Sequence, residues 1–239
     1  MQTLAVVLAA GSGSRFGSAS PKQLRVLAGR NLIEHCVQAF EDAPGVDKVL
    51  VVTATAIEEQ VARDLVGHEK VAAVIPGGAS RTDSTRLALA WLAASVPGDA
   101  NVLFHDAARP LVDQRIIADC VAALDQWQAI GVVVPSSDTI VELADGTIQR
   151  VLPRQALARC QTPQGFRLSV ISKAYQLADA DPAFATFPAT DDCGVVLRYL
   201  PEVTIGAVSG SERNLKITYT SDLAIANALL DPGADADTA

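Results

Sequence analysis

The sequence predicts an α/β fold with three layers, in which helices cover both faces of a mostly parallel, twisted sheet. Two observations lead to this prediction. Apolar runs of strand length alternate with amphipathic runs of helical period, and such alternation produces right-handed crossovers onto a parallel sheet. The chain has 239 residues, of which 49% are hydrophobic, so it can bury one large core.

Before residue 100, the sequence predicts three strands and two helices. Apolar runs indicate buried strands over residues 4–8, 49–52 and 71–75. Asn31 and Glu34 have the spacing of a capping box, which predicts that a helix begins there. A second helix is expected to begin near Ser80 or Ser84. Its inner face is predicted to carry Leu87, Trp91 and Leu92.

Two more strands and one helix are predicted before the pattern changes. Short apolar runs over residues 102–104 and 131–134 indicate the fourth and fifth strands. Between them, Asp113 is the expected N-cap of a helix. The inner face of this helix is predicted to consist of Ile116, Ile117, Cys120, Val121 and Leu124.

A β-hairpin is predicted from residues 139–143 and 147–151, which flank Ala144-Asp145-Gly146. Asp-Gly between two alternating runs is a strong turn signal. We therefore expect an arm over about residues 138–158 that projects from the sheet. The arm is either a bare extension of the sheet or an element exchanged with a second subunit. Because a two-stranded hairpin is marginally stable alone, we expect a homodimer formed through it.

Beyond the hairpin, the pattern returns to helices. They are predicted over residues 170–178, 192–197 and 221–230, with a strand over 203–208. We expect residues 1–230 to form a single domain. The segment 231–239 is acidic, contains Gly and Pro, and is predicted to be disordered.

The composition argues against several kinds of partner and site. A net charge of −8 and a pI near 4.8 disfavour a broad basic surface for nucleic acid or an anionic membrane. The apolar runs are too short to span a membrane, and Met1 leads into the first strand without a charged segment, so we expect a cytoplasmic protein. Four scattered cysteines and three histidines indicate reduced thiols rather than a zinc site or disulfides.

A glycine-rich loop over residues 9–22 follows the first strand and indicates a polyphosphate ligand. Backbone N–H groups of such a loop can face an anion, and Arg15 and Lys22 add two cations. Lys22 lies too far beyond Gly17 for a Walker loop, and the glycines are spaced too widely for a dinucleotide fingerprint. The alternative is a plain connecting loop whose charges are incidental.

Further polar clusters follow other predicted strands. Residues 105–110 follow the fourth strand, Asp138-Thr139 follows the fifth, and residues 214–218 lie near the end of the chain. In an open parallel sheet the carboxyl ends of the strands share one crevice, so these groups can converge although they are far apart in sequence. This crevice is the candidate active site.

With these clusters in place, the chain resembles the 2-C-methyl-D-erythritol 4-phosphate cytidylyltransferase family, a group that includes the ribitol 5-phosphate cytidylyltransferases. The matching motifs occur in family order from the first strand almost to the last helix. They are the loop 9–22 with Pro21-Lys22-Gln23, Gly77-Gly78 with Arg81 and Ser84, residues 105–110, Asp138-Thr139, Thr162-Pro163-Gln164, Thr190-Asp191 and residues 214–218. The resemblance implies a Rossmann-like nucleotidyltransferase fold.

The resemblance implies transfer of CMP from CTP to 2-C-methyl-D-erythritol 4-phosphate, which releases pyrophosphate and forms 4-diphosphocytidyl-2-C-methyl-D-erythritol, an isoprenoid precursor of the non-mevalonate pathway. Arg15, Lys22 and Lys216 would be the catalytic cations around the α-phosphorus. The attacking phosphate oxygen is already ionised, so no general base is needed. Mg²⁺ would be bound mainly through the CTP phosphates; its protein ligands are unknown, and Asp106 is the nearest candidate carboxylate.

The resemblance also implies which residues bind the two substrates. The nucleotide would be bound by Ala9, Ala10, Gly11, Ser12, Gly13, Gly78, Arg81 and Ser84. The acceptor would be bound by Asp106, Arg109, Thr139, Arg154 and Thr162. Asp106 and Thr139 would contact its hydroxyls, and Arg109 and Arg154 its phosphate. Arg154 lies in the hairpin region and could serve the site of a partner subunit, whereas His105 is interpreted as a structural hydrogen-bonding residue.

Three alternatives stay open. Ala107-Ala108 before Arg109 favours methylerythritol phosphate as acceptor, whereas residues 136–139 and 191–194 fit that pattern less closely and keep ribitol 5-phosphate as the alternative. An NAD-dependent oxidoreductase is disfavoured, because residues 53–55 lack an acidic side chain that would bind the ribose. A non-catalytic nucleotide-binding module is disfavoured by the presence of Lys216 and the acceptor residues.

Overall fold

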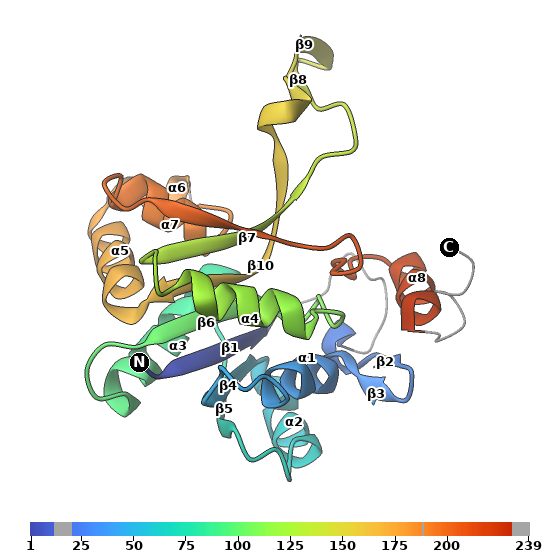
Figure 1. The fold of residues 1–239 in the computed structure, drawn as a ribbon, viewed down its shortest axis with the longest axis vertical. Helices are drawn as coiled ribbons and strands as arrows, with labels where there is room; N and C mark the ends of the chain where they lie inside the picture. The colour runs from blue at the N-terminus through green and yellow to red at the C-terminus, as the bar shows by residue number, and fades with distance from the viewer. Residues whose placement is uncertain (12–20, 188, 231–239) are drawn as a thin grey trace.

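A seven-stranded sheet forms the centre of the molecule, in the order β11-β7-β10-β6-β1-β4-β5 (Figure 1). The computed structural model describes residues 1–11, 21–187 and 189–230. The strands of the sheet are β1 (Thr3–Ala9), β4 (Lys48–Thr53), β5 (Val71–Pro76), β6 (Asn101–Asp106), β7 (Ala129–Pro135), β10 (Ala158–Arg167) and β11 (Ile205–Ser209). Neighbouring strands are parallel except where β10 pairs with β6 and β7. The predicted mostly parallel sheet is confirmed.

Helices cover both faces of this sheet. One face carries α1 (Leu32–Glu41), α2 (Glu58–Asp64) and α4 (Gln114–Ala123), whose buried residues share one core with Ala5 and Val7 of β1. The other face carries α3 (Arg81–Ser95), α5 (Leu168–Ala180), α6 (Pro182–Thr186) and α7 (Asp192–Tyr199), whose buried residues share a second core with Leu4 and Val6. Successive residues of β1 therefore alternate between two cores, as the two-residue period of a strand requires. The predicted three layers are confirmed.

The last helix, α8 (Thr220–Leu230), packs beside a short hairpin formed by β2 (Val26–Leu27) and β3 (Arg30–Asn31). Leu27, Leu32, Ile217 and Ala226 form a third, small apolar cluster there. The backbone N–H of Ile217 donates to the carbonyl of Ala108 at 2.8 Å, which fixes the C-terminal segment next to the end of β6. Of the helices in the described ranges, none combines the length and apolar character needed to cross a bilayer.

Side-chain caps set the helix starts, largely as the sequence predicts. Asn31 and Glu34 form a capping box on α1, and Asp113 accepts the N–H of Ile116 at 2.7 Å to cap α4. Ser80 and Asp83 form a second capping box, so α3 begins after Ser80. The predicted inner face of α3 was partly wrong. Leu87 is 42% exposed, and the buried residues are Ser84, Thr85, Ala88, Leu89 and Leu92.

Strand β10 was missed by the sequence patterns, which predict nothing over residues 158–167. It contains Pro163 and Gly165, residue types that are unfavourable inside a strand and conceal its pattern. Gly165 is required by packing, because an added Cβ would lie 2.8 Å from Leu103 Cδ2. The pairing of β10 with β7 also shifts register between Gln161 and Gln164, which breaks the alternation. The strand lies antiparallel between two parallel neighbours, an arrangement that local sequence does not encode.

The predicted hairpin is present as an arm that stands clear of the sheet (Figure 1). It consists of β8 (Val141–Ala144) and β9 (Thr147–Val151). Asp145 and Gly146 have φ values of 49° and 74°, the left-handed conformation that a tight Asp-Gly turn requires. The short helical turn η4 (Arg154–Ala156) leads from the arm into β10. Two further turns are η2 (Lys22–Leu24) and η3 (Thr55–Ile57).

Candidate active site

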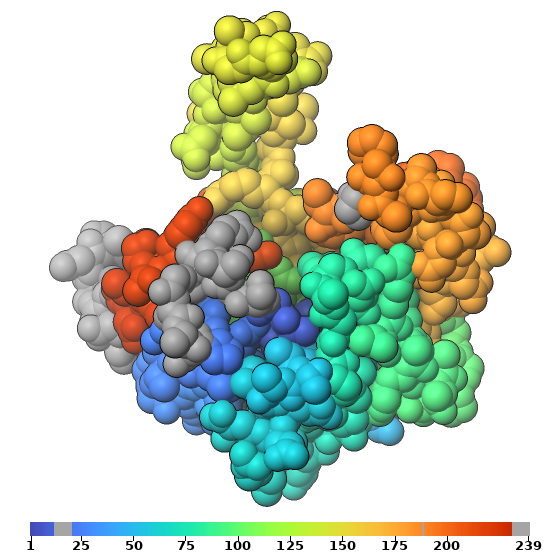
Figure 2. Space-filling model, turned by 180° about the vertical axis from the view of Figure 1, so that it is seen from behind, coloured from blue at the N-terminus to red at the C-terminus, as the bar shows by residue number. Residues whose placement is uncertain are grey.

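The predicted polar clusters meet at one edge of the sheet. The parallel strands β1, β4, β5 and β6 end there at Ala9, Thr53, Pro76 and Asp106. Because β10 is antiparallel, its first residues lie at the same edge, and Ala158 pairs with Pro135 at the end of β7. In the space-filling view, this edge forms a hollow between α3 (teal) and the C-terminal segment (red), with the first strand (dark blue) visible inside it (Figure 2).

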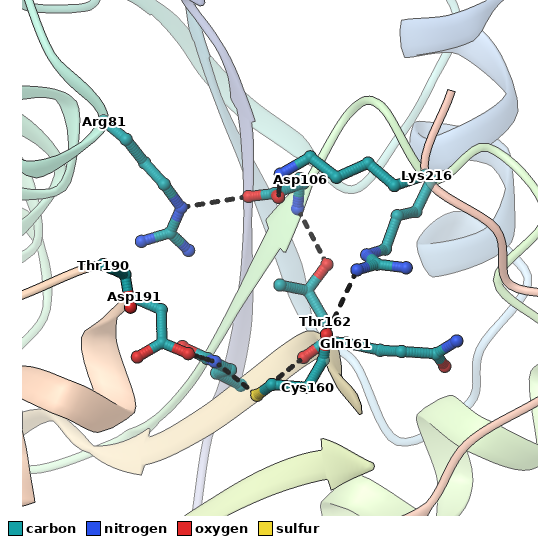
Figure 3. Close-up of a pocket in the computed structure, with 10 residues that line it drawn as sticks. Arg81, Asp106, Cys160, Gln161, Thr162, Thr190, Asp191 and Lys216 are labelled. Atoms are coloured by element: carbon teal, nitrogen blue, oxygen red, sulfur yellow. Dashed lines mark hydrogen bonds and ion pairs between the residues drawn. The ribbon is translucent and has the colours of Figure 1, made fainter. Parts of the chain in front are cut away.

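A pocket of about 170 Å³ opens at this edge (Figure 3). Its lining is almost entirely polar and comes from α3, β6, β10, the start of α7 and the C-terminal segment. The lining residues are Arg81, Asp106, Arg109, Cys160, Gln161, Thr162, Gln164, Thr190, Asp191 and Lys216. The structure therefore brings together Asp106, Arg109 and Thr162, which were predicted to bind the acceptor, and the predicted catalytic residue Lys216. Arg81, predicted among the nucleotide residues, lines this pocket too.

Asp106 lies at the centre of the pocket between two cations. Lys216 Nζ is 2.7 Å from Asp106 Oδ2, and Arg81 Nε is 3.0 Å from Oδ1. Burial raises the pKa of the Asp106 carboxyl, but the charges of Arg81 and Lys216 outweigh burial and hold this pKa well below its usual value. Asp106 is therefore ionised throughout the neutral range, with both oxygens oriented by cations.

A buried network holds Asp106 from the backbone side. Its backbone N–H donates to Thr162 Oγ1 at 3.0 Å, and Thr162 Oγ1 lies 3.1 Å from His105 Nδ1. His105 Nε2 is 3.0 Å from the carbonyl of Arg109 and must donate to it. Burial keeps the imidazole neutral, and in a neutral ring whose Nε2 is the donor, Nδ1 accepts the Thr162 hydroxyl proton. Burial lowers the pKa of His105 to about 4, which agrees with a structural role and with no role in proton transfer at neutral pH.

Arg109 is held so that its guanidinium lines the pocket. Nη1 donates to the carbonyl of Asn214 at 2.8 Å, and Nη2 donates to the carbonyl of Cys160 at 3.3 Å. Burial lowers the pKa of Arg109, although an arginine stays charged. A half-buried guanidinium whose hydrogen-bond partners in the described chain are carbonyls rather than a carboxylate is well suited to bind an anion.

Close backbone approaches shape the region beside this pocket, where nucleotide-binding residues were predicted. A Cβ at Gly77 would lie 2.3 Å from Ala10 Cβ, so the ends of β1 and β5 touch only because residue 77 is glycine. A Cβ at Gly78 would lie 2.3 Å from Asp83 Cβ. The N–H of Gly78 donates to Ser84 Oγ at 3.2 Å. Ala9, Ala10, Gly78 and Ser84 therefore belong to one continuous wall.

The two lysines predicted to be catalytic come from opposite ends of the chain and reach the same region. The ammonium of Lys22 donates to the carbonyl of Ile217, the residue that follows Lys216. The next residue, Gln23, donates from Nε2 to the carbonyl of Gly11 and so secures the end of β1. Arg15, Ser12 and Gly13 lie outside the described residues, as does the predicted tail 231–239.

Two of the predicted acceptor residues do not line the pocket. Thr139 and Arg154 are exposed at the base of the arm. Arg154 Nη1 donates to the carbonyl of Ser137 at 3.1 Å, which ties the two sides of the arm together. Within one subunit, these residues are therefore part of the arm and not of the pocket.

Several residues around the pocket were not among the predicted site residues. Gln164 Nε2 donates to Asp191 Oδ2 at 2.8 Å, and Asp191 caps α7 by accepting the N–H of Gly194 at 2.8 Å. Cys160 and Gln161 lie on β10, whose strand pattern is hidden in the sequence. The motifs Thr162-Pro163-Gln164 and Thr190-Asp191 were the available signal, but a motif alone does not show which of its side chains face a pocket.

Among the described residues, no cluster of three or more His, Cys, Asp or Glu side chains could hold a metal ion. Asp106 is the carboxylate at the centre of the pocket, and both of its oxygens already contact cations.

A family model and the similar curated proteins point to the same family. A family model described as 2-C-methyl-D-erythritol 4-phosphate cytidylyltransferase matches residues 3–232. A protein of that name from Thermobifida fusca is 51% identical over 238 residues, which cover 96% of this chain and 93% of the relative. A bifunctional ribulose 5-phosphate reductase/CDP-ribitol pyrophosphorylase from Haemophilus influenzae is 36% identical, over 95% of this chain and 48% of the relative.

Solved structures agree with these relatives. The 2-C-methyl-D-erythritol 4-phosphate cytidylyltransferase of Thermus thermophilus has a TM-score of 0.74 and 31% identity, over 94% of this chain and 96% of that one. The 4-diphosphocytidyl-2C-methyl-D-erythritol synthase of Anaerococcus prevotii has a TM-score of 0.82 at 24% identity, over 96% of this chain and 98% of that one, and shows the same fold.

Proposed function

The chain belongs to the 2-C-methyl-D-erythritol 4-phosphate cytidylyltransferase family, and on this premise we propose that it transfers CMP from CTP to 2-C-methyl-D-erythritol 4-phosphate. The products are pyrophosphate and 4-diphosphocytidyl-2-C-methyl-D-erythritol. The observation that carries the proposal is the gathering of Lys216, Arg109 and Arg81 around one ionised carboxylate, in a polar pocket beside a glycine-shaped wall. Such a site can hold a hydroxylated, anionic acceptor next to a nucleotide.

The proposed reaction is an attack by a phosphate oxygen of the acceptor on the α-phosphorus of CTP. The chain contributes positive charge: Lys22 and Lys216, together with Arg15, would stabilise the negative charge that develops as the α-phosphorus becomes five-coordinate. The attacking oxygen is already ionised, so no residue has to remove a proton. The neutral, buried His105 is consistent with a reaction without a general base.

We assign the two substrates to adjoining parts of the crevice. Backbone groups of Ala9, Ala10 and Gly11, with Gly78 and Ser84, would surround the cytosine and ribose, because small residues let the backbone approach a base closely. Asp106 would accept hydrogen bonds from acceptor hydroxyls, and Arg109 would bind its phosphate. Thr162 would support Asp106, since its hydroxyl is already engaged with Asp106 N–H and His105.

We further propose that the enzyme is a homodimer joined through the arm. Leu143 and Ile148 form a cross-strand pair and are 64% and 65% exposed. Val151 on the same arm is 61% exposed. Apolar side chains on a projecting hairpin need a surface to cover them, and a second arm supplies one. In such a dimer, Thr139 and Arg154 would reach the acceptor pocket of the partner.

Mg²⁺ is proposed as the counter-ion of the triphosphate. Both oxygens of Asp106 contact cations, which fits an ion held mainly by phosphate oxygens and water, with Asp106 as the nearest protein carboxylate. The ion would neutralise triphosphate charge and thereby make the α-phosphorus easier to attack.

A cytoplasmic location is proposed from the thiols. Cys36, Cys120, Cys160 and Cys193 are all free, and Cys160 is exposed in the pocket. Free thiols persist in a reducing compartment, whereas in an oxidising one an exposed thiol is readily modified.

The function is tested by supplying CTP with methylerythritol phosphate or with ribitol 5-phosphate and following pyrophosphate release. We expect efficient release with methylerythritol phosphate. Much faster turnover of ribitol 5-phosphate would establish the second candidate function, a ribitol 5-phosphate cytidylyltransferase. The name of the Haemophilus influenzae relative, a CDP-ribitol pyrophosphorylase, is the reason for testing it. Absence of pyrophosphate with both acceptors would contradict a cytidylyltransferase of either kind.

A further inference from the structure

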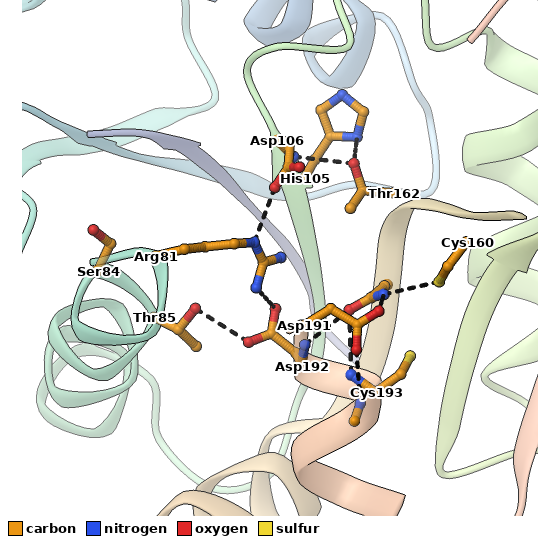
Figure 4. A network of polar contacts seen from close by, with 12 residues as sticks. Arg81, Ser84, Thr85, His105, Asp106, Cys160, Thr162, Asp191, Asp192 and Cys193 are labelled. Carbon is orange, nitrogen blue, oxygen red and sulfur yellow. Dashed lines mark hydrogen bonds and ion pairs between the residues drawn. The ribbon is translucent and has the colours of Figure 1, made fainter. Parts of the chain in front are cut away.

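A row of alternating charges runs from the pocket into the core. Figure 3 shows Lys216 beside Asp106, and Figure 4 shows Arg81 between Asp106 and Asp192. Lys216 contacts Asp106, Asp106 contacts Arg81, and Arg81 Nη1 lies 2.8 Å from Oδ2 of Asp192. The Asp192 side chain is fully buried, whereas Lys216 at the other end is 43% exposed. The row therefore links a carboxylate in the core to the pocket.

Asp192 is held rigidly at its inner end. Its Oδ1 accepts the hydroxyl of Tyr175 at 2.7 Å and that of Thr85 at 3.2 Å. Its backbone N–H donates to Gln164 Oε1 at 3.1 Å. These contacts come from α5, α3 and β10, so the position of the carboxylate is set by three elements of the core.

The guanidinium of Arg81 contacts two carboxylates through different nitrogens. Nε binds Asp106 and Nη1 binds Asp192, while Nη2 is buried without a hydrogen-bond partner in the described chain. Burial lowers the pKa of Arg81, but Asp192 and then Asp106 outweigh burial, so this pKa is raised and the group stays charged. Without Asp192, Asp106 would be the remaining carboxylate paired with Arg81 in the described chain, and guanidinium and carboxylate favour a bidentate geometry in which two nitrogens bind one carboxylate.

We propose that Asp192 is a positioning residue of the active site: it holds one nitrogen of Arg81, and thereby keeps the second oxygen of Asp106 available to Lys216 and to an acceptor hydroxyl. This inference rests on the proposed function. It assigns to Asp192 an effect on the acceptor and little effect on CTP. Its hydrogen bonds and ion pair in the described chain do not include Ala9, Ala10, Gly78 or Ser84, and Arg81, although predicted among the nucleotide residues, contacts Asp106 on the acceptor side.

The test is Asp192→Asn, which keeps the size and loses the charge. Initial rates are measured with each substrate varied in turn. We expect the KM for methylerythritol phosphate to rise about tenfold or more, the scale seen when a supporting residue of a site is lost. The KM for CTP should change by less than about twofold. An unchanged acceptor KM, or an equal rise for both substrates, would overturn the proposal.

A double-mutant cycle shows whether the effect passes through Arg81. In an Arg81→Gln background, Asp192→Asn should add no further rise in acceptor KM. A full additional rise would mean that Asp192 acts by another route, and the proposal would fall. The matched control is Asp179→Asn, which removes the exposed partner of Arg86 on the same helix α3 and should leave both KM values unchanged.

If Asp192→Asn does not fold, Tyr175→Phe replaces it, because this change loosens the carboxylate but keeps its charge. We then expect about a threefold rise in acceptor KM at constant CTP KM, and no rise would contradict the proposal. Turnover of the two acceptors by the wild-type protein distinguishes a failure of the proposed function from a failure of the proposed role of Asp192. If it turns over ribitol 5-phosphate instead, the same split of KM values is expected for that acceptor. If it turns over neither, both proposals fail.

Discussion

Lys22 and Lys216 are separated by almost the whole chain, yet Lys22 binds the carbonyl of the residue next to Lys216. We expect Lys216→Ala and Lys22→Ala each to lower kcat by about a hundredfold or more, because each removes one cation from the developing charge. The measurement is pyrophosphate release at saturating substrates. Lys173→Ala, an exposed lysine on α5, is the control and should be neutral. Near-normal turnover in either variant would remove that lysine from the mechanism.

His105 makes the stability of the protein depend on pH in a defined window. Its folded pKa of about 4 lies below the ordinary value of 6.5, because burial disfavours the charged ring. The unfolded chain therefore binds the proton first as pH falls, and the free energy of unfolding decreases between pH 6.5 and about 4. The total contribution is about 3 kcal/mol. Asp106 adds a loss only below the ordinary Asp pKa of about 4, so the two windows are separate.

Urea unfolding at a series of pH values measures this dependence. His105→Gln, which has no group that titrates there, should flatten the profile between pH 6.5 and about 4 while lowering stability at about pH 7. An equally steep profile in His105→Gln would assign the pH dependence to other groups.

Among the helices and strands, the sequence predicts the features that depend on residues close together in the chain. It misses those that depend on contacts with other strands and helices. The capping box of α1, the start of α3 near Ser80 and the Asp-Gly hairpin follow from residues a few positions apart, and they were predicted correctly. Strand β10 depends on contacts of Gly165 with Leu103 and Ile130, which come from β6 and β7. Leu87 was placed inside by helical spacing, but the face that α3 turns to the sheet is decided by packing.

The same distinction applies to the site. The motifs that follow the strands located Asp106, Arg109 and Lys216 correctly at one edge, since parallel strands end together. Asp192 and Gln164 support the pocket through contacts between α3, β10 and α7. The motif Thr162-Pro163-Gln164 is visible in the sequence, but the contacts depend on packing between these elements and could not be predicted from it. Arg154 and Thr139 stay on the arm within one subunit, so their predicted role requires a second chain.

The contact between the ends of β1 and β5 gives a prediction for that pair of elements. Gly77→Ala would place a Cβ 2.3 Å from Ala10 Cβ, so one strand end has to move. We expect a loss of about 1–3 kcal/mol in stability and a raised KM for CTP, because the wall beside the nucleotide is displaced. Thermal unfolding and CTP titration measure the two effects. Gly45→Ala is the control, since the nearest atoms to its Cβ would all belong to the Val121 side chain, at 3.2 Å or more, and Gly45 is exposed. Unchanged values for Gly77→Ala would show that the wall adapts.

For the whole molecule, the exposed arm predicts assembly. Replacing the cross-strand pair Leu143 and Ile148 by Asp should convert a dimer to a monomer, because four charges would be buried at the interface of two arms. Sedimentation velocity measures the change. Val66→Asp, at an 81% exposed position away from the arm, should leave the assembly intact. A wild-type monomer, or a dimer that survives the double change, would contradict assembly through the arm.

Mixing inactive subunits tests whether the arm acts on its partner. An Arg154→Ala chain has an intact pocket and a defective arm. A Lys216→Ala chain has a defective pocket and an intact arm. If Arg154 serves the partner's pocket, a mixed dimer contains one site with both residues intact and one site with neither. Random exchange makes half of the dimers mixed, so we expect recovery to about a quarter of wild-type activity. If Arg154 acts within its own subunit, every site lacks one residue and mixing restores nothing, so the absence of recovery would contradict a role of Arg154 in the partner's pocket.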